Sequence, residues 1–507
     1  MSGDAKSVFR EGGFRAVIAA VHEEIQEIYL SDKTPWVIGY SGGKDSTAIL
    51  QLCWNAVAEL PVEKRTKPIH VISTDTLVEN PVVALWVNRS LEVMADAARV
   101  QSMPIVPHRL TPKLSQSFWV NLIGRGYPAP RLKFRWCTER LKIHPSNDFI
   151  RQTVQEHGEV ILVLGIRKAE SSKRAATMAR HGKKSVRDRL TPNASMQNSL
   201  IYTPIESWSN DDVWMYLMQV KNSWGYNNKD LLTMYQGATA DGECPLVVDT
   251  NTPSCGNSRF GCWVCTLVDE DKSMTAMVQN DIEKEWMAPL LEIRNELDFR
   301  TEAARQRDQA NRDMRRMTGQ VKYFEDKEGR GRLIKGPYTQ KARAHWLRRV
   351  LEAQRLVRER GPVEVRNWDL ITLGELEEIR RIWVGEKHEV EDLLPRIYEE
   401  ETGAPYPGPN AEEDPVLNDS ALKVLRDITG DNELHYELVR NLLDIERQYR
   451  NRALRRGLFH DLKQAISRCF YDGEDDALER ARTRAQLRDT ESTDELRELA
   501  AQEGGAS

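Results

Sequence analysis

Short apolar runs alternate with longer amphipathic stretches through the first 205 residues of the chain. Five of the runs have the length and composition of β-strands, at residues 36–40, 69–73, 105–110, 160–164 and 201–205. Before and between them lie stretches with apolar side chains at helical spacing, at residues 14–29, 46–58 and 81–98. The run at 160–164 is apolar on both faces, as a central parallel strand requires. The alternation predicts an α/β fold with a doubly wound parallel sheet.

The pattern changes after residue 269, where the strand signal fades and charged helical stretches follow. Residues 270–360 predict helices, interrupted at 327–332 by a hairpin or loop, and helical patterning returns at 421–465. We therefore expect five regions. They are an α/β domain at 1–240, a cysteine-rich segment at 241–270, a basic-then-acidic helical region at 271–403, a linker at 404–410, and a helical C-terminal region with a frayed tail at 411–507.

Composition narrows the class of protein. The chain has 507 residues, 40% of them hydrophobic and 29% charged, with a formal net charge of −5. No stretch approaches the roughly 18 consecutive apolar residues of a membrane helix, and the N-terminus lacks an apolar signal core. Seven cysteines, an odd number, argue against a disulfide framework. These features predict a cytoplasmic protein.

Charge is unevenly distributed along the chain. Residues 300–358 contain 17 Lys and Arg against 7 Asp and Glu, whereas residues 386–414 contain 10 acidic and 2 basic residues. Residues 167–189 form a second basic stretch, with 9 basic and 2 acidic residues. A single charge run is ordinarily a solvated helix face. Two basic blocks in an acidic protein also fit a phosphate-backbone partner, although no helix-turn-helix or RNA-binding fingerprint accompanies them.

A glycine-rich segment lies between the first predicted strand and its helix. Its glycines permit close backbone approach, and the N-terminus of the following helix directs partial positive charge to the same place. Lys44 adds a full positive charge, and Asp45 could orient the loop or hold Mg²⁺. The segment lacks the spacing of a Walker loop. The residues expected to bind a nucleotide here are Ser41, Gly42, Gly43, Lys44, Asp45, Ser46 and Thr47.

This segment resembles the signature of the PP-loop ATP pyrophosphatase superfamily, whose members cleave ATP between the α and β phosphates. Other segments resemble its PAPS reductase branch: Asp75 after the second strand, Gly165 and Arg167 after the central strand, and Arg174 in the loop beyond. All follow the carboxyl ends of predicted strands, where open α/β sheets bind ligands. The resemblance implies that these residues bind the nucleotide and that Lys44, Asp45 and Arg167 act in catalysis.

Four of the cysteines are clustered, with the spacing C-x10-C-x6-C-x2-C at Cys244, Cys255, Cys262 and Cys265. Such a cluster in a reducing compartment points to a metal, either structural zinc or an iron–sulfur cluster. The segment around Cys137 resembles the one that carries the first cluster cysteines of APS reductases, except that Trp136 replaces one cysteine of the usual pair. The resemblance favours a 4Fe–4S cluster.

Five cysteines are thus candidates for four iron positions. Our first hypothesis assigns the four clustered cysteines to the cluster and leaves Cys137 to carry sulfur near the nucleotide. The alternative makes Cys137 a ligand with three of the four. The remaining two cysteines, Cys53 and Cys469, are expected to be packing residues.

Taken together, the motifs of residues 10–270 and the length of the chain resemble the DndC family of bacterial DNA phosphorothioation. The resemblance implies a sulfurtransferase that uses ATP and Mg²⁺ to activate a DNA backbone phosphate. It also implies a cysteine desulfurase as sulfur source, and DndD- and DndE-type partners. Alternatives are a PAPS or APS reductase, a tRNA thiolase, or a zinc-stapled nucleic-acid-binding scaffold without ATP turnover.

Overall fold

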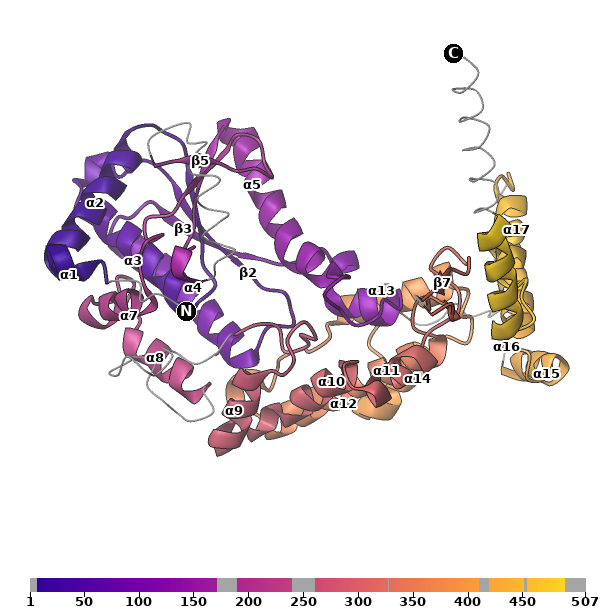
Figure 1. The fold of residues 1–507 in the computed structure, drawn as a ribbon. Helices are drawn as coiled ribbons and strands as arrows, with labels where there is room; N and C mark the ends of the chain where they lie inside the picture. Colours follow the sequence, from indigo (N-terminus) through magenta and orange to yellow (C-terminus); the bar gives the residue numbers. More distant parts are fainter. Residues whose placement is uncertain are drawn as a thin grey trace, which may run out of the picture. The chain divides into compact units, whose positions relative to one another are not determined.

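The computed structural model describes residues 7–170, 189–238, 260–326, 328–409, 419–450 and 454–487. The chain divides into two compact units (Figure 1). The first contains residues 1–118 and 130–294, and the second contains residues 119–129 and 295–507. The expected boundary at residue 240 falls outside the described residues. Among the described residues, no helix is both long and apolar enough to cross a membrane.

A six-stranded sheet organises the first unit. Its strands are β1 (Trp36–Gly39), β2 (Ile69–Thr74), β3 (Ile105–Leu110), β4 (Val160–Val163), β5 (Thr191–Pro192) and β6 (Ser199–Tyr202). Their order across the sheet is β3-β2-β1-β4-β6-β5, and every pairing is parallel except that of β5 with β6. The predicted doubly wound parallel α/β sheet is therefore confirmed. The sequence pattern missed β5, a two-residue edge strand, and set the fifth strand slightly late.

Helices cover both faces of this sheet (Figure 1). They are α1 (Phe9–Gly12), α2 (Phe14–Leu30), α3 (Lys44–Ala58), α4 (Pro81–Val100), α5 (His144–His157), α7 (Asn210–Gln219) and α8 (Asn228–Gly237). Two further helices follow later in the chain and lie away from the sheet: α9 (Lys272–Asn280) and α10 (Ala288–Leu297), which ends in the second unit. Short 3-10 segments are η1 (Val62–Lys64), η2 (Leu114–Gln116), η5 (Lys168–Glu170) and η6 (Ile282–Met287), and η4 (Thr138–Ile143) is a π-helix.

Alternate strand residues direct these helices to the two faces. On β1, Trp36 and Ile38 join the large core beneath α2, α3, α4 and α7, whereas Val37 joins a smaller core with Ile150 of α5. Neighbouring side chains of a strand point to opposite faces, so both faces of β1 are apolar. All four residues of β4 are buried, so both faces of this strand are covered as well.

The second unit is mainly helical. It contains the π-helical segments η3 (Val120–Gly124) and η8 (Ile382–Glu386), the 3-10 segment η7 (Val363–Val365) and a hairpin of β7 (Tyr323–Glu325) and β8 (Gly331–Leu333). Its helices are α11 (Glu302–Ala310), α12 (Gln340–Arg360), α13 (Leu373–Arg381), α14 (Leu393–Thr402), α15 (Asp419–Thr429), α16 (Glu433–Arg450) and α17 (Leu458–Arg468). The predicted helical C-terminal region is therefore confirmed.

Residues 119–129 belong to the second unit although they follow β3 of the first. The Trp119 indole donates a hydrogen bond to the carbonyl of Leu370 at 2.7 Å, and the Trp383 indole donates to the carbonyl of Ile123 at 2.9 Å. Backbone carbonyls buried in an apolar core need such partners. The five regions expected from the sequence did not assign residues 119–129 to the second unit.

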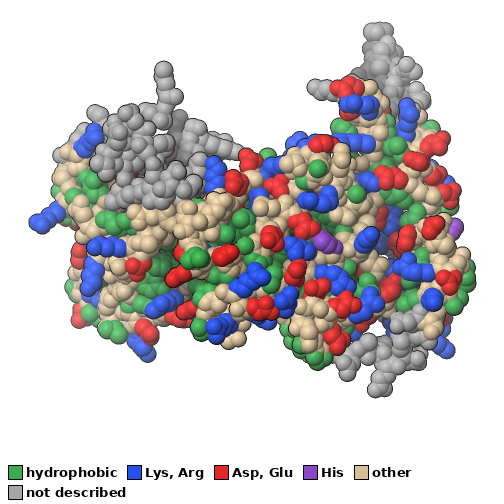
Figure 2. All heavy atoms as spheres, turned by 90° about the horizontal axis from the view of Figure 1, so that it is seen from below, with side chains coloured by type: hydrophobic (Ala, Val, Ile, Leu, Met, Phe, Trp, Pro, Cys, Tyr) green, Lys and Arg blue, Asp and Glu red, His purple; other side chains and the backbone are tan. Residues whose placement is uncertain are grey.

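Arginines of the basic block at 300–358 are paired with acidic residues inside the second unit. Arg343 pairs with Glu389, and Arg348 pairs with Glu400 at 2.6 Å. Arg315 pairs with Glu437 at 2.7 Å. Figure 2 accordingly shows basic and acidic side chains interspersed over the face in view. These pairs reduce the net field that the basic block presents to a phosphate backbone.

Candidate active site

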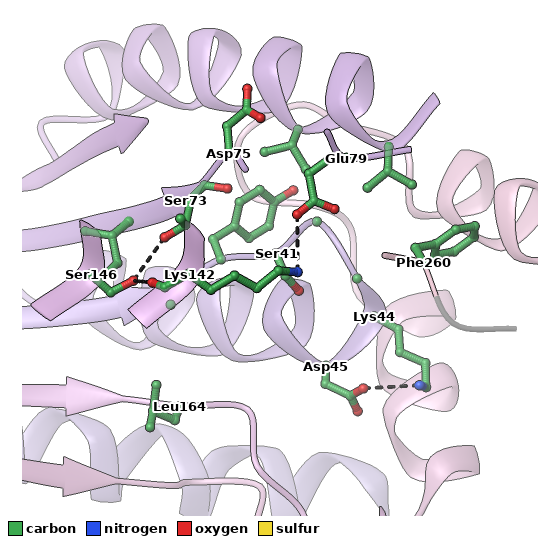
Figure 3. A pocket seen from close by; sticks show the side chains of 18 of the residues that line it. Ser41, Lys44, Asp45, Ser73, Asp75, Glu79, Lys142, Ser146, Leu164 and Phe260 are labelled. Carbon is green, nitrogen blue, oxygen red and sulfur yellow. Dashed lines mark hydrogen bonds and ion pairs between the residues drawn. The ribbon is translucent and has the colours of Figure 1, made fainter. Parts of the chain in front are cut away.

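The glycine-rich loop connects β1 to α3 at the carboxyl edge of the sheet and opens into a cavity of about 1110 Å³ (Figure 3). The cavity lies within the first unit, and its lining includes Ser41, Gly42, Gly43, Lys44 and Asp45. The helix begins at Lys44, two residues earlier than expected, so that the amides of its first turn lie beside the cavity. The first amides of a helix have no intrahelical partner and can bind an anion.

The hydroxyl group of Ser46 forms hydrogen bonds with backbone groups of the loop and so stabilises its conformation. Ser46 donates to the carbonyl of Gly43 at 2.9 Å and accepts from the amide of Ser41 at 3.2 Å. Gly42 has a φ of +74°, which favours glycine, and a Cβ at this position would collide with Val87 of α4. The loop therefore requires glycine both for its dihedral angle and for its packing.

The Asp45 carboxylate forms ion pairs with two basic side chains from different parts of the chain. Arg167 Nε donates to one carboxylate oxygen at 2.6 Å, and Lys44 Nζ lies 3.1 Å from the other. Arg167 follows β4, and Gly165 makes room for Asp45, because a Cβ on Gly165 would lie 3.1 Å from the Asp45 backbone. Since both carboxylate oxygens are engaged, Asp45 orients Lys44 and Arg167 in this arrangement. The two cations supply the positive charge that a triphosphate needs.

A second wall of the cavity comes from the tips of β2 and β3. Asp75 follows β2, accepts from the backbone amide of Leu77 at 2.7 Å and pairs with Arg109 of β3 at 3.0 Å. Ser73 and Thr74 also line the cavity, and Thr74 is hydrogen-bonded to Ser146 of α5 at 3.0 Å. Parallel strands bring their carboxyl ends to one edge, which is why residues far apart in sequence meet here.

The turn that contains Cys262 and Cys265 is attached to this wall by backbone hydrogen bonds. The amide of Asn80 donates to the carbonyl of Gly261 at 3.1 Å, and the amide of Trp263 donates to that of Val78 at 2.9 Å. The amide of Cys265 closes the turn on the carbonyl of Cys262 at 3.0 Å. The cysteine turn is thus fixed to the segment that joins β2 to α4.

Three donors converge on one carboxylate oxygen of Glu79 in the cavity wall. Thr76 Oγ1 lies 3.1 Å from Glu79 Oε1, Lys142 Nζ 3.2 Å and Cys262 Sγ 3.7 Å. Thr76 Oγ1 is also 3.3 Å from Cys262 Sγ. Figure 3 shows Lys142 extending across the cavity to Glu79. The cavity lining and the cysteine turn therefore share side-chain contacts.

Burial raises the pKa values of the Cys262 and Cys137 thiols, which keeps both thiols protonated at neutral pH. Desolvation is the largest cause that raises the pKa of Cys262, followed by the negative charge of Glu79. The pKa of Lys142 is raised by the thiolate form of Cys262 and by Glu79, despite the opposing effect of burial, and while Cys262 is protonated the charge of Glu79 has this effect alone. Burial also raises the pKa of Cys137, which lies just before η4. Binding of a metal or sulfur would require these thiols to lose their protons.

The described cysteines fit a thiolate-ligated cofactor in donor type but do not form such a site alone. Negative charge on Cys265 would raise the pKa of both Cys137 and Cys262. Among the described residues, however, no group of three or more His, Cys, Asp or Glu side chains is arranged to hold a metal ion. Cys244, Cys255 and Arg174 lie outside the described residues, so the ligand set remains a prediction. A bound cluster would be held by these thiolates and would supply an electron-rich sulfur and iron centre.

The structure brings seven of the eleven residues predicted to bind the nucleotide to one cavity: Ser41, Gly42, Gly43, Lys44, Asp45, Asp75 and Arg167. Ser46 and Gly165 contact this loop without lining the cavity, and Cys137 does not line it either. Thr47 instead is buried in α3, and Cys53 is buried in the core of the first unit. Cys469 is buried in the second unit, where it lies 3.8 Å from Arg315. The packing role expected for these two cysteines agrees with their burial.

Sequence analysis missed several residues of the cavity. Lys142 extends to Glu79, Arg109 holds Asp75, and the Tyr235 hydroxyl lies 3.4 Å from the amide of Lys44. Tyr235 comes from α8, and no sequence signal singles it out. Arg109 could have been noticed, because it stands at the carboxyl end of a predicted strand.

Comparison with known proteins finds a family model that is similar to part of this chain. The family model of the phosphoadenosine phosphosulfate reductase domain matches residues 35–267. An uncharacterized protein of Methanocaldococcus jannaschii is 29% identical over 197 residues, which are 39% of this chain and 34% of that protein. This chain thus covers about a third of that relative.

Among solved structures, phosphoadenylyl-sulfate reductase from Candida auris, in a phosphate complex, is similar with a TM-score of 0.26 and 13% identity. The similarity covers 42% of this chain and 89% of that one. The family match spans the parallel sheet, the glycine-rich loop and the Cys262–Cys265 turn. Residues 35–267, a little under half of the chain, are therefore similar to the phosphoadenosine phosphosulfate reductase domain.

Proposed function

We propose that this protein is an ATP-dependent sulfurtransferase that replaces a non-bridging oxygen of a DNA backbone phosphate by sulfur. The observation that carries the proposal is the shared wall between the cavity and the cysteine turn. The loop with Lys44 and Asp45 lines one cavity, and Glu79 of that cavity contacts the thiol of Cys262. This contact supports the proposal that a nucleotide and a sulfur-bearing residue act on one bound substrate.

In the first step, a non-bridging oxygen of the DNA phosphate attacks the α-phosphorus of ATP, and pyrophosphate leaves. Lys44 and Arg167 offset the charge that develops on the pyrophosphate, and a bound Mg²⁺ would add positive charge there. Asp45 orients both cations through the contacts described above. Activation is needed because an unmodified phosphodiester oxygen is a very poor leaving group. The product is an adenylylated DNA phosphate.

In the second step, the terminal sulfur of a cysteine persulfide attacks the activated phosphorus and AMP leaves. Cys137 is the first candidate for the persulfide, and Cys262 is the alternative closest to the cavity lining. A second cysteine thiolate then attacks the S–S bond, which releases the phosphorothioate and leaves a disulfide. A small thiol reduces that disulfide, and a cysteine desulfurase supplies the next persulfide. DndD- and DndE-type proteins are the proposed further partners.

The test measures pyrophosphate release from ATP and incorporation of sulfur into duplex DNA by mass spectrometry of nuclease digests. Lys44→Ala and Asp45→Ala are expected to abolish pyrophosphate release while leaving the metal content of the protein unchanged. Lys64→Ala is the matched control, because Lys64 is exposed and precedes β2 at the opposite edge of the sheet. Pyrophosphate release at the normal rate in Lys44→Ala would refute the assignment of the loop.

A second candidate function is reduction of an adenylyl sulfate, which the family match of residues 35–267 favours. Sulfite formation from APS or PAPS, with no sulfur incorporated into DNA, would establish it. Thiolated bases in co-purifying tRNA would instead indicate a tRNA thiolase. Anaerobic purification with iron, sulfide and zinc analysis separates an iron–sulfur enzyme from a zinc-stapled scaffold.

A further inference from the structure

A short hairpin beside the cysteines projects basic and apolar side chains into solvent. Arg131 and Phe134 are joined by two backbone hydrogen bonds of 2.7 and 3.3 Å, and Leu132 and Lys133 form the turn between them. Leu132 is 70% exposed and Phe134 is 41% exposed. Lys133 and Arg135 are exposed as well. We call residues 131–135 the basic hairpin.

The hairpin is firmly anchored although its tip is exposed. Trp136, directly after it, is buried and stacks on Phe118 with ring centroids 5.3 Å apart. Directly before it, the carbonyl of Pro130 accepts a hydrogen bond from Thr266 Oγ1 at 2.6 Å. Thr266 follows Cys265 in sequence, so the base of the hairpin is tied to the cysteine turn. A rigid support reduces the entropy lost when an exposed segment binds a partner.

The segment from the hairpin to the end of η4 carries a concentrated positive charge. Residues 131–143 contain five Lys and Arg and one acidic residue, Glu139, in a chain whose formal net charge is −5. Lys142 of this segment pairs with Glu79, whereas within the described residues no carboxylate forms an ion pair with Lys133 or Arg135. The basic block at 300–358 differs, because acidic residues of its own unit neutralise several of its arginines.

The same segment leads directly to the cavity. Cys137 follows Trp136, and η4 then brings Lys142 to the cavity lining beside Glu79. A polyanion on the hairpin would therefore be bound by a segment that continues into the proposed site of chemistry. Double-stranded DNA carries one charge per about 1.7 Å of its axis, so neighbouring phosphates can contact the hairpin while another is presented to the cavity.

We infer that the basic hairpin is a docking surface for the DNA backbone, in which Lys133 and Arg135 contact phosphates and Phe134 packs against the sugar–phosphate edge. The inference rests on the proposed function, since it names the surface that delivers the DNA phosphate. Backbone contacts of this kind position a duplex without reading its sequence. Exposed apolar side chains at the tip of an otherwise basic segment add contact area.

The test is fluorescence anisotropy of a labelled 30-base-pair duplex at several salt concentrations, without ATP or a sulfur donor. Each lost phosphate contact reduces the slope of log K against log salt by about 0.9, so Lys133→Ala/Arg135→Ala is expected to reduce it by about 2. We expect the affinity of this variant to fall about tenfold or more at low salt. Phe134→Ala is expected to weaken binding without changing the slope.

The matched control removes the same number of charges elsewhere. Lys33→Ala/Lys64→Ala changes exposed lysines that precede β1 and β2, at the edge of the sheet opposite the cavity, and is expected to bind DNA like the wild type. Thermal unfolding and the affinity for a non-hydrolysable ATP analogue should be unchanged in every variant. An unaltered affinity and salt slope in Lys133→Ala/Arg135→Ala would overturn the inference. Binding of tRNA but not of the duplex would overturn the assignment to DNA.

The outcomes also separate this inference from the proposed function. If the hairpin variant binds DNA normally and the wild type still forms phosphorothioate, the docking surface is wrong and the proposed function stands. If the hairpin variant loses DNA binding but no preparation incorporates sulfur, the docking surface stands and the chemistry is wrong.

Discussion

Gly42 offers a sharp test of how the loop is built. Alanine at this position keeps the sequence almost unchanged but adds one methyl group. The φ of +74° would cost a residue with a Cβ about 1–2 kcal/mol. The new Cβ would also overlap Val87 Cγ2 and lie 3.2 Å from Trp86 Cδ1, and overpacking of this kind costs about 1–3 kcal/mol.

The sum, about 2–5 kcal/mol, opposes the loop conformation that surrounds the cavity. If ATP binds only that conformation, the dissociation constant should rise at least about 30-fold, since 1.4 kcal/mol corresponds to a factor of ten. Calorimetric titration with a non-hydrolysable ATP analogue measures this change. Gly42→Ala/Val87→Ala removes the overlapping methyl group and should recover the packing part of the loss.

Gly158→Ala is the matched control for backbone strain. Gly158 has a φ of +83°, no atom lies near its added Cβ, and it precedes β4 at the edge of the sheet opposite the cavity. It should lower the free energy of unfolding by about 1–2 kcal/mol and leave ATP affinity unchanged. Wild-type affinity in Gly42→Ala, or an equal loss of affinity in Gly158→Ala, would refute the reasoning.

Three further predictions concern the buried ionisable groups. Burial, reinforced by the charge of Arg343, lowers the pKa of Lys387 to about 8, so the unfolded chain binds more protons between that value and the ordinary lysine pKa. The free energy of unfolding should therefore rise with pH from about 8 to about 10. Urea titrations should show that Lys387→Met removes this pH dependence, and a wild-type pH dependence in the variant would contradict the prediction. Glu389→Gln should leave the buried Arg343 without its carboxylate and lower the free energy of unfolding by about 3–5 kcal/mol, whereas the exposed pair partner Asp96→Asn should change it by less than about 1 kcal/mol. Burial raises the pKa of Cys53, so iodoacetamide at neutral pH should leave Cys53 unmodified in the native protein and modify it in urea, as peptide mass spectrometry would show; rapid modification of the native protein would contradict its burial.

The predicted strands and helices of the first unit were accurate where periodicity was strong. Helix α4 begins at Pro81 with the Asn80 side chain as its cap, and β1 to β4 lie close to their predicted positions. Local signals sufficed because each of these elements buries one or both faces. The two-residue strand β5 was missed because it contains no periodic pattern, and α8 was missed because its polar composition hides its one buried face.

By itself, the sequence determined the parallel sheet and the place of the nucleotide loop. The spacing of apolar residues fixes which faces are buried, and the glycines and charges of residues 41–47 directly follow a strand. Only the tertiary structure decided that Arg167 and Asp45 form an ion pair, that Glu79 joins Lys142 to Cys262, and that arginines of the 300–358 block are paired with acids. These contacts join residues separated by tens to hundreds of positions. They depend on how the strands align and how the chain returns to the sheet edge, and no local pattern of side chains encodes that geometry.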